Sequence, residues 1–334
     1  MGHRMRFLGF IALLLGTSAC SSLSATSERP GFANHPEAKA FIDEMVERHA
    51  MDRGELTELF AEAQVREDIL SAISRPAEGK PWHEYRPIFL TRSRIDGGVA
   101  FWNEHADILA RVEKAFGVDA QVIVAIIGVE TRYGGNTGSY RVIDALSTLA
   151  FEYPPRAKFF RSELEQFLLL TKEERVDRRE ARGSYAGAMG HGQFISSSYR
   201  NFAVDFDGDG RRDLWDSRED IIASVANYLS VHGWQLGAPV AEQVEPKTRP
   251  AEELTGAGIK PSLTLDQLKA AGIQSRKADD DDTLATLIAL EQQDGPEYWL
   301  GFNNFYVITR YNRSPLYAMA VYQLSEEIRE ARER

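Results

Sequence analysis

Cysteine is nearly absent from this sequence of 334 residues, in which Cys20 is the only one. A single thiol excludes an intramolecular disulfide, so the fold must be stable without one. Basic residues are also scarce relative to acidic ones, and the formal net charge is −11. This balance argues against a nucleic-acid partner, because binding phosphates requires a basic surface. It is compatible with an uncharged substrate but does not indicate one.

Long apolar runs are missing as well. The run Phe7–Leu15 is too short to cross a bilayer. It follows Arg4 and Arg6 and precedes small residues, which is the layout of a secretory signal. Because Cys20 follows directly, residues 1–20 resemble a bacterial lipoprotein signal, which implies a lipidated, periplasmic protein anchored in the outer membrane. Thr17 departs from the usual aliphatic residue, and the alternative is an ordinary cleaved secretory signal.

The composition divides the rest of the chain into segments. Residues 21–34 are rich in serine, threonine, proline and glycine, which is typical of a flexible tether. Helical spacing of apolar residues over 35–100 predicts a helical domain, in which the aromatic stretch Pro81–Pro87 is expected to break helical order. Prolines and glycines between 237 and 293 interrupt the periodicity and predict a small inserted β-subdomain.

Residues 101–236 and 294–325 are predicted to form a mostly helical central part. A strand is expected within it at Phe305–Arg310, a run rich in aromatic and β-branched residues. Helices are expected from the apolar periodicity at these ranges: Phe101–Phe116, Val118–Tyr133, Lys158–Leu170, Ile221–His232 and Leu316–Glu330.

Glu130 follows an uncharged apolar run, Val122–Val129, near the end of one of these helices. A carboxyl group on that face is partly removed from water, and the negative end of the helix dipole disfavours its ionised form. Both effects favour a carboxylic acid that keeps its proton, as a general acid must when it protonates a glycosidic oxygen. The alternative is a glutamate paired with Arg132 or another surface base.

A glycine-rich segment, Gly187–Phe194, mixes small, apolar and polar side chains and follows Ser184 closely. Such a segment suits close approach of the backbone to a ligand, with Ser184 and Gln193 as hydrogen-bond partners. By itself it is equally compatible with a tight helix–helix crossing.

Three segments together resemble the membrane-bound lytic transglycosylase B family: Gly128–Gly134, Ser184–Phe194 and Asn304–Asn312. The resemblance covers residues 35–325. It implies a mainly α, α+β protein whose lysozyme-like core corresponds to 101–236 and 294–325, with an α-helical domain and a small β-domain around it. It also implies an enzyme that cleaves the bond between N-acetylmuramic acid and N-acetylglucosamine in peptidoglycan and leaves a 1,6-anhydromuramyl end.

Hydrolytic glycosidases use two carboxylates. The resemblance instead implies one, Glu130, which acts first as an acid and then as a base. Two alternatives stay open: a hydrolytic muramidase with a second carboxylate, and a non-catalytic peptidoglycan-binding lipoprotein. The partners implied are glycan strands of peptidoglycan, the outer membrane through the N-terminal lipid, and the cell-wall synthesis or secretion machinery.

The resemblance also assigns substrate contacts, position by position. Arg156 matches one of two adjacent arginines that face the peptide stem or lactyl group, and the other is Pro155 here. Aromatic rings suit a glycan groove because sugars present C–H faces to them, although each ring has ordinary core packing as its alternative. The positions that match the groove are Tyr85, Ser184, Gln193, Phe194, Tyr228, Tyr311 and Asn312.

The segment Asp205–Asp216 has the ligand pattern of an EF-hand calcium loop. Its first, third and fifth positions are carboxylates, glycine occupies the sixth, and the seventh offers a backbone carbonyl. These ligands are Asp205, Asp207, Asp209 and Arg211. Asp216 replaces the usual glutamate at position 12, and Glu219 and Asp220 are the other candidates for the final ligand. We expect a structural calcium ion and no organic cofactor; the alternative is an acidic turn without metal.

Overall fold

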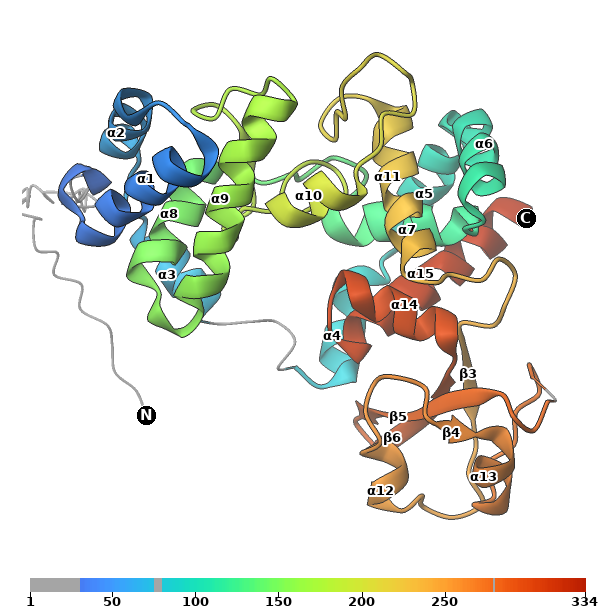
Figure 1. Cartoon of the computed structure of the whole chain (residues 1–334). Coiled ribbons are helices and arrows are strands. Elements are labelled where there is room, and N and C mark those ends of the chain that lie inside the picture. Colours follow the sequence, from blue (N-terminus) through green and yellow to red (C-terminus); the bar gives the residue numbers. More distant parts are fainter. Residues whose placement is uncertain (1–30, 75–79, 279) are drawn as a thin grey trace, which may run out of the picture.

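The computed structural model describes residues 31–74, 80–278 and 280–334. The expected signal segment with Cys20, and residues 21–30 of the expected tether, lie outside the described residues. Two groups of helices lie side by side, and a small subdomain with strands lies below one of them (Figure 1). Within the described ranges, no helix combines the length and the apolar character needed to span a membrane.

The N-terminal lobe consists of five α-helices from two separate parts of the chain. Asp52 caps the second of them by accepting a hydrogen bond of 2.8 Å from the backbone of Glu55. Phe32, in the 3₁₀ turn Phe32–Asn34, is buried against Phe151, so the expected tether ends earlier than residue 34. The helices are α1 (Pro36–His49), α2 (Arg53–Glu62), α3 (Glu67–Ile73), α8 (Val142–Glu152) and α9 (Ala157–Glu173).

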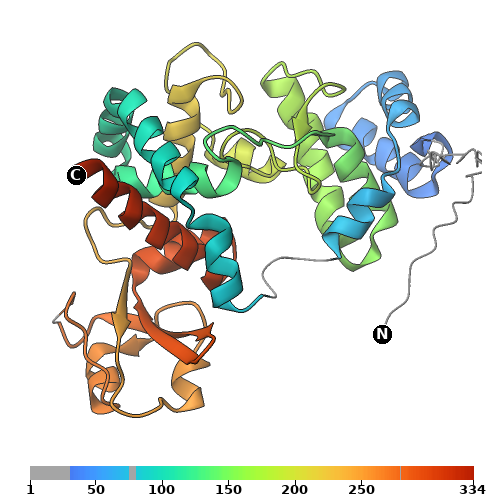
Figure 2. The same cartoon turned by 180° about the vertical axis from the view of Figure 1, so that it is seen from behind.

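The core lobe is built around α7, in which all residues from Val122 to Val129 are buried. Helix α15 packs across α7, α5 and α4, and it is in front when the molecule is seen from behind (Figure 2). Helix α10 (Ser196–Phe202) packs on α9 and α11 and so connects the two lobes. The core helices are α4 (Trp82–Phe89), α5 (Arg92–Glu104), α6 (Ala106–Phe116), α7 (Ala120–Thr131), α11 (Arg218–Val231), α14 (Asn303–Tyr311) and α15 (Pro315–Glu333).

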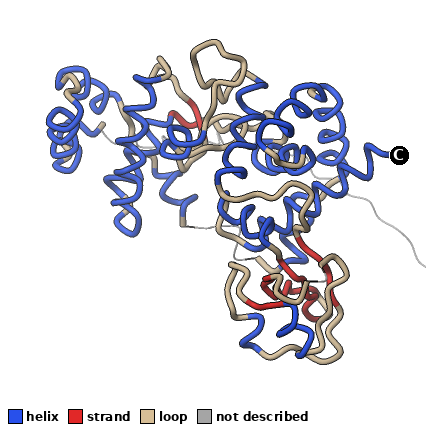
Figure 3. Tube along the Cα trace, turned by 45° about the vertical axis from the view of Figure 1, so that its right-hand side comes forward, coloured by secondary structure: helices blue, strands red, loops and turns tan. Residues whose placement is uncertain are grey.

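The β-subdomain holds an antiparallel sheet of order β3-β6-β5-β4 and two short helices (Figure 3). It has a hydrophobic core of its own, which includes Leu268, Leu287 and Leu300. A separate ladder joins β1 (Tyr140–Arg141) to β2 (Arg182–Gly183). The subdomain's elements are β3 (Ala241–Val244), α12 (Glu252–Thr255), β4 (Leu263–Thr264), α13 (Leu265–Ala270), β5 (Leu284–Gln292) and β6 (Gly295–Gly301).

Several local predictions differ from the structure. The strand expected at Phe305–Arg310 is wrong, since these residues lie in α14 and bury Phe305 and Ile308 against neighbouring helices. The segment Pro81–Pro87 does not break helical order, because Pro81 is the N-cap residue of α4 and Pro87 is accommodated inside that helix. The predicted helix Phe101–Phe116 is divided at His105 into α5 and α6.

The segment boundaries also differ from those expected. Helices within 35–100 belong to both lobes, because α1–α3 pack on α8 and α9, whereas α4 and α5 pack on α15. Strand β6 begins after residue 293, the predicted end of the β-subdomain, so the sheet includes residues that were expected in the core. These differences arise because packing partners come from distant parts of the chain, which composition does not reveal.

Candidate active site

Glu130 lies in the last turn of α7 and is half-buried. After Thr131 the chain adopts three left-handed residues in succession, Arg132, Tyr133 and Gly134, with φ of 52°, 60° and 89°. This reversal ends the helix sharply and returns the chain toward the core. Glu130 is therefore presented at the edge of a helix whose backbone is held by packing on almost every side.

The glycine-rich segment is joined to this helix end. The Thr131 hydroxyl donates to the backbone oxygen of His191 at 2.9 Å. A side chain at Gly134 would overlap the His191 ring, so glycine is required there by space as well as by its positive φ. Burial and the charge of Arg218 lower the pKa of His191 to about 4, so its imidazole is neutral near pH 7.

A buried arginine caps the carbonyl end of α7. Arg94 Nε donates to the backbone oxygen of Gly128 at 2.9 Å, and the Tyr133 hydroxyl donates to the backbone oxygen of Arg94 at 2.8 Å. A cation at this end offsets the helix dipole. The dipole contribution that we expected at Glu130 is therefore weakened.

Tyr317 donates a hydrogen bond to Glu130. Its hydroxyl lies 2.6 Å from Glu130 Oε1, although the two residues are 187 positions apart. Tyr317 stands in the first turn of α15, which Ser314 caps by accepting from the Tyr317 backbone. Burial and the charge of Glu130 raise the pKa of Tyr317 well above its ordinary value, so the hydroxyl stays protonated. Sequence reasoning missed this residue; its only signal was proximity to the matched Tyr311.

Three rings of the predicted groove pack together beside Glu130. The centre of the Phe194 ring lies 5.8 Å from the ring centres of both Tyr228 and Tyr311, and the centres of the two tyrosine rings are 4.8 Å apart. The Tyr311 hydroxyl donates to the backbone oxygen of Gly192 at 2.5 Å, and that of Tyr228 to the backbone oxygen of Arg310 at 2.5 Å. The charge of Glu130 contributes to raising the pKa of Tyr311, which places this cluster close to the carboxyl group.

Tyr85 approaches from α4 and is also buried. Its ring centre lies 6.3 Å from that of Trp82 and 5.1 Å from that of Phe89. Because Phe194, Tyr228 and Tyr85 are at most 8% exposed, each of these rings contributes mainly an edge to the surface. Core packing, the alternative for these rings, accounts for most of their area.

The segment Ser184–Phe194 forms two tight turns, which excludes the helix–helix crossing considered for it. The Ser184 hydroxyl accepts from the backbones of Ala186 and Ala188, and it thereby holds the first turn. Met189 and Phe194 exchange backbone hydrogen bonds of 2.9 and 3.0 Å across the second turn. Gln193, at φ 50°, donates its amide to the backbone oxygens of Thr137 and Gly190.

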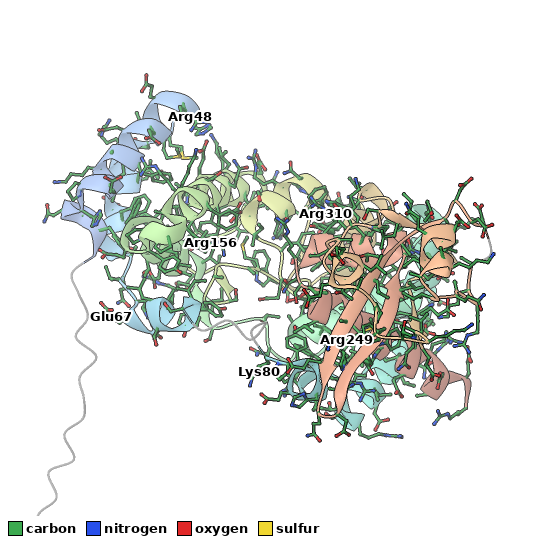
Figure 4. All side chains as sticks on the ribbon, turned by 90° about the horizontal axis from the view of Figure 1, so that it is seen from below. Arg48, Glu67, Lys80, Arg156, Arg249 and Arg310 are labelled. Carbon is green, nitrogen blue, oxygen red and sulfur yellow. The ribbon has the colours of Figure 1, made fainter. Side chains whose placement is uncertain are left out.

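Two predicted contacts lie further apart. Asn312 follows α14 directly and is half-buried next to Tyr311. Arg156 is exposed on the N-terminal lobe, where its guanidinium lies 4.4 Å from the centre of the Phe159 ring. Figure 4 shows Arg156 on the lobe of α8 and α9 and Arg310 on the other lobe. Arg156 thus belongs to a different wall from the tyrosines around Glu130.

The acidic loop brings three exposed carboxylates together. Oxygen atoms of Asp205, Asp207 and Asp209 lie within 4.8 Å of one another. Asp220 is fully buried beneath them, and its carboxylate accepts from the backbones of Phe206 at 2.7 Å and Asp213 at 2.8 Å. Burial raises the pKa of Asp220, and the backbone hydrogen bonds from Asp213, Phe206 and Asp207 oppose this effect.

The other candidate ligands point elsewhere. Glu219 forms an ion pair of 2.6 Å with Arg111, and Asp216 is exposed after the loop. Arg211 is held at the seventh position because its backbone donates to Asp209 at 2.8 Å. The donor set consists of hard oxygens only, which fits calcium better than a softer metal.

The model of the transglycosylase SLT domain matches residues 33–326 of the chain. That match covers the N-terminal lobe, the core lobe and the β-subdomain alike. The chain belongs to this transglycosylase family. The resemblance stated from the three sequence segments is thereby confirmed, as are the expectation of an enzyme and that of a mainly helical, lysozyme-like fold.

Individual relatives agree with this assignment. Membrane-bound lytic murein transglycosylase B of Escherichia coli is 44% identical over 311 residues, which cover 90% of this chain and 85% of the relative. The structure of the catenated lytic transglycosylase SltB1 of Pseudomonas aeruginosa superposes with a TM-score of 0.85 at 52% identity, covering 90% of this chain and 99% of that one. The protein is a lytic transglycosylase of this type that acts on peptidoglycan.

A third relative bears on the acidic loop. The lytic transglycosylase Slt35 of Escherichia coli was solved in complex with calcium; it is 42% identical and superposes with a TM-score of 0.83, covering 92% of this chain and 97% of that one.

Proposed function

We propose that Glu130 cleaves the bond between N-acetylmuramic acid and N-acetylglucosamine without consuming water. The observation that carries this proposal is the arrangement at Glu130, where one carboxyl group receives a hydrogen bond from the buried Tyr317 among tyrosine rings. Two carboxylates that follow Glu130 in the sequence, Asp144 and Glu152, are engaged in the N-terminal lobe. Asp144 pairs with Arg141 at 2.7 Å, and Glu152 lies 3.5 Å from His35.

The reaction needs the same residue twice. Glu130 first gives its proton to the glycosidic oxygen, and the bond from that oxygen to C1 of the muramoyl sugar breaks. The O6 hydroxyl of the same sugar then bonds to C1 and returns a proton to the Glu130 carboxylate. The product is a 1,6-anhydro end, and Glu130 regains the proton with which it began.

Tyr317 supports both steps in different ways. Since its hydroxyl donates to Oε1, the transferable proton is held by Oε2, and the orientation of the carboxyl group is set by α15. When Glu130 becomes a carboxylate, the same hydrogen bond gains strength because its acceptor is charged. The preorganised donor thus stabilises the ionised intermediate state of the acid.

Replacing Glu130 with Gln tests the proposal, because the amide keeps the shape but has no transferable proton. Solubilisation of cell-wall sacculi should be abolished while the melting temperature stays close to that of the wild type. Mass spectrometry of the wild-type digest should find muramyl ends one water lighter than reducing ends. Reducing ends alone would establish the hydrolytic alternative, and a Glu130→Gln enzyme that still cleaves would remove Glu130 from the mechanism.

We further propose that the acidic loop binds a structural calcium ion. Asp205, Asp207, Asp209 and the Arg211 carbonyl would hold it, and the buried Asp220 is better placed than Asp216 or Glu219 to complete the site. The ion would neutralise carboxylates that otherwise repel one another. It would supply stability to the segment before α11 and take no part in bond cleavage.

We also propose export and lipidation at Cys20, with the mature enzyme in the periplasm at the outer membrane. The N-terminal sequence supports this, and so does the membrane-bound relative. Arg156 would meet the peptide stem from the N-terminal lobe. Labelled palmitate should enter the wild-type protein and not a Cys20→Ser variant; equal labelling of the two would refute lipidation at this residue.

A further inference from the structure

A cavity of about 580 Å³ lies where α4, α15 and the sheet of the β-subdomain meet. None of the residues described at Glu130 lines it. Its walls combine an aromatic ring, several amides and charges of both signs. The residues that line it include His83, Arg86, Glu297, Trp299, Gln323 and Glu327.

The charges in this cavity do not neutralise one another. Arg86 is half-buried, and its Nε donates to Gln323 Oε1 at 2.7 Å. In the part of the chain that the structure describes, Arg86 forms no ion pair, and neither does Glu327. Glu297 accepts a hydrogen bond of 3.1 Å from the Trp299 indole and forms no ion pair with any described residue. Two further glutamates of α15 differ, because Glu326 and Glu330 are paired with Arg329 and Arg334.

Charges of opposite sign that line one cavity without pairing suit a ligand that carries both signs. A carboxylate can meet the guanidinium of Arg86 through two hydrogen bonds, and an ammonium group can meet Glu297 and Glu327. A ligand that is only anionic would be repelled by the glutamates. The half-buried Trp299 ring adds an apolar surface for the methylene groups between the charged ends.

We propose that this cavity binds the free amino-acid end of a peptidoglycan peptide stem, where an ammonium and a carboxylate share one carbon. The inference rests on the proposed function, which places peptidoglycan on this enzyme. The diaminopimelate residue of an uncross-linked stem has this chemistry. Occupation of the cavity would favour strands whose stems still have free ends.

The distance from the active site is compatible with such a substrate. Helix α15 carries Tyr317 at Glu130 and Glu327 at the cavity. The ten residues from Tyr317 to Glu327 span about 15 Å of helix. Diaminopimelate is the third residue of the stem, and three residues of ordinary extended backbone reach about 11 Å. The γ-linked glutamate and the long diaminopimelate side chain add to this length, so the free end of a stem attached to a bound sugar can extend to the cavity.

Titration calorimetry with the sugar-free tripeptide L-Ala-γ-D-Glu-meso-diaminopimelate tests this directly. The Glu130→Gln variant serves as the parent, so that binding is measured without cleavage. Adding Arg86→Gln or Glu327→Gln should each weaken tripeptide binding by about tenfold or more, as expected for loss of a charge-assisted contact. Glu84→Gln, an exposed change on α4 outside the cavity, is the matched control and should leave the affinity unchanged.

A second probe separates the zwitterion from general peptide binding. Acetylation of the free amine of diaminopimelate should weaken tripeptide binding as much as Glu327→Gln does. The acetylated tripeptide should bind the Glu327→Gln variant with an affinity close to that found for either change alone. The proposal is overturned if the tripeptide does not bind the parent, if the acetylated form binds equally well, or if both cavity variants retain the parent affinity. Since Glu327 is on an accessible helix face, tripeptide affinity can be measured for Glu327→Gln even if Arg86→Gln does not fold. Failure of cleavage by the wild type would refute the proposed function and leave this binding result intact.

Discussion

Removal of the Tyr317 hydroxyl is the sharpest test of how Glu130 is positioned. The change Tyr317→Phe deletes one atom and keeps the ring, which is 3% exposed and packed in the core. The lost hydrogen bond of 2.6 Å has a carboxyl acceptor. Hydrogen bonds to charged groups contribute roughly 1.5–3 kcal/mol, so a bond that strengthens as Glu130 ionises should change the rate by about 10- to 150-fold.

The assay is the initial rate of muropeptide release from purified sacculi at saturating and limiting substrate. We expect the loss mainly in kcat, because Tyr317 acts on the carboxyl group and the groove is otherwise unchanged. Tyr140→Phe is the matched control, since its hydroxyl also lies near a carboxylate, 3.2 Å from Asp68, but in the N-terminal lobe. It should keep the wild-type rate.

Two results would refute this reasoning. A folded Tyr317→Phe enzyme within about twofold of the wild-type rate would mean that the hydrogen bond does not assist the reaction. An equal loss in Tyr140→Phe would show that the effect comes from general destabilisation. A circular-dichroism melt of both variants separates loss of folded protein from loss of catalysis.

Two further predictions concern stability. Excess chelator should lower the melting temperature of the wild type, because an ion that binds only the folded state stabilises that state. In the Asp220→Asn variant, the chelator should change the melting temperature much less. Equal melting temperatures of the wild type with and without chelator would exclude the calcium site. Gly134→Ala should lower the free energy of unfolding in urea by more than Gly272→Ala does. Both glycines have positive φ, of 89° and 80°, so backbone strain costs about 1 kcal/mol at either position. Of the two, Gly134 is the one at which the new methyl group would overlap a side chain, that of His191. Equal losses would mean that the His191 contact is unimportant.

Local spacing in the sequence was informative wherever neighbouring residues determine structure. The uncharged run before Glu130 predicted a helix, and α7 is buried there. The helices at Lys158–Leu170 and Ile221–His232 are confirmed within a few residues of their predicted ends. The pattern Asp205, Asp207 and Asp209 predicted a cluster of carboxylates, and their oxygens do come together. In each case the local structure depends on residues that are close together in the sequence.

Composition failed where packing overrides local preference. Residues Phe305–Arg310 have strand-forming side chains, yet they form a helix because one face is buried between α11 and α15. Likewise, the helices of 35–100 divide between two lobes according to the partners that cover their apolar faces.

Glu130 as a candidate acid was therefore readable from the sequence, together with the family segments around it and the first ligands of the metal loop. The tertiary structure alone decided that Tyr317 is its donor, that Arg94 offsets the helix dipole behind it, and that Asp220 lies beneath the acidic loop. It also created the cavity at Arg86 and Glu327. The physical reason is that hydrogen bonds and charges act over a few ångströms in space, and folding brings together residues separated by 14, 34 or 187 positions along the chain.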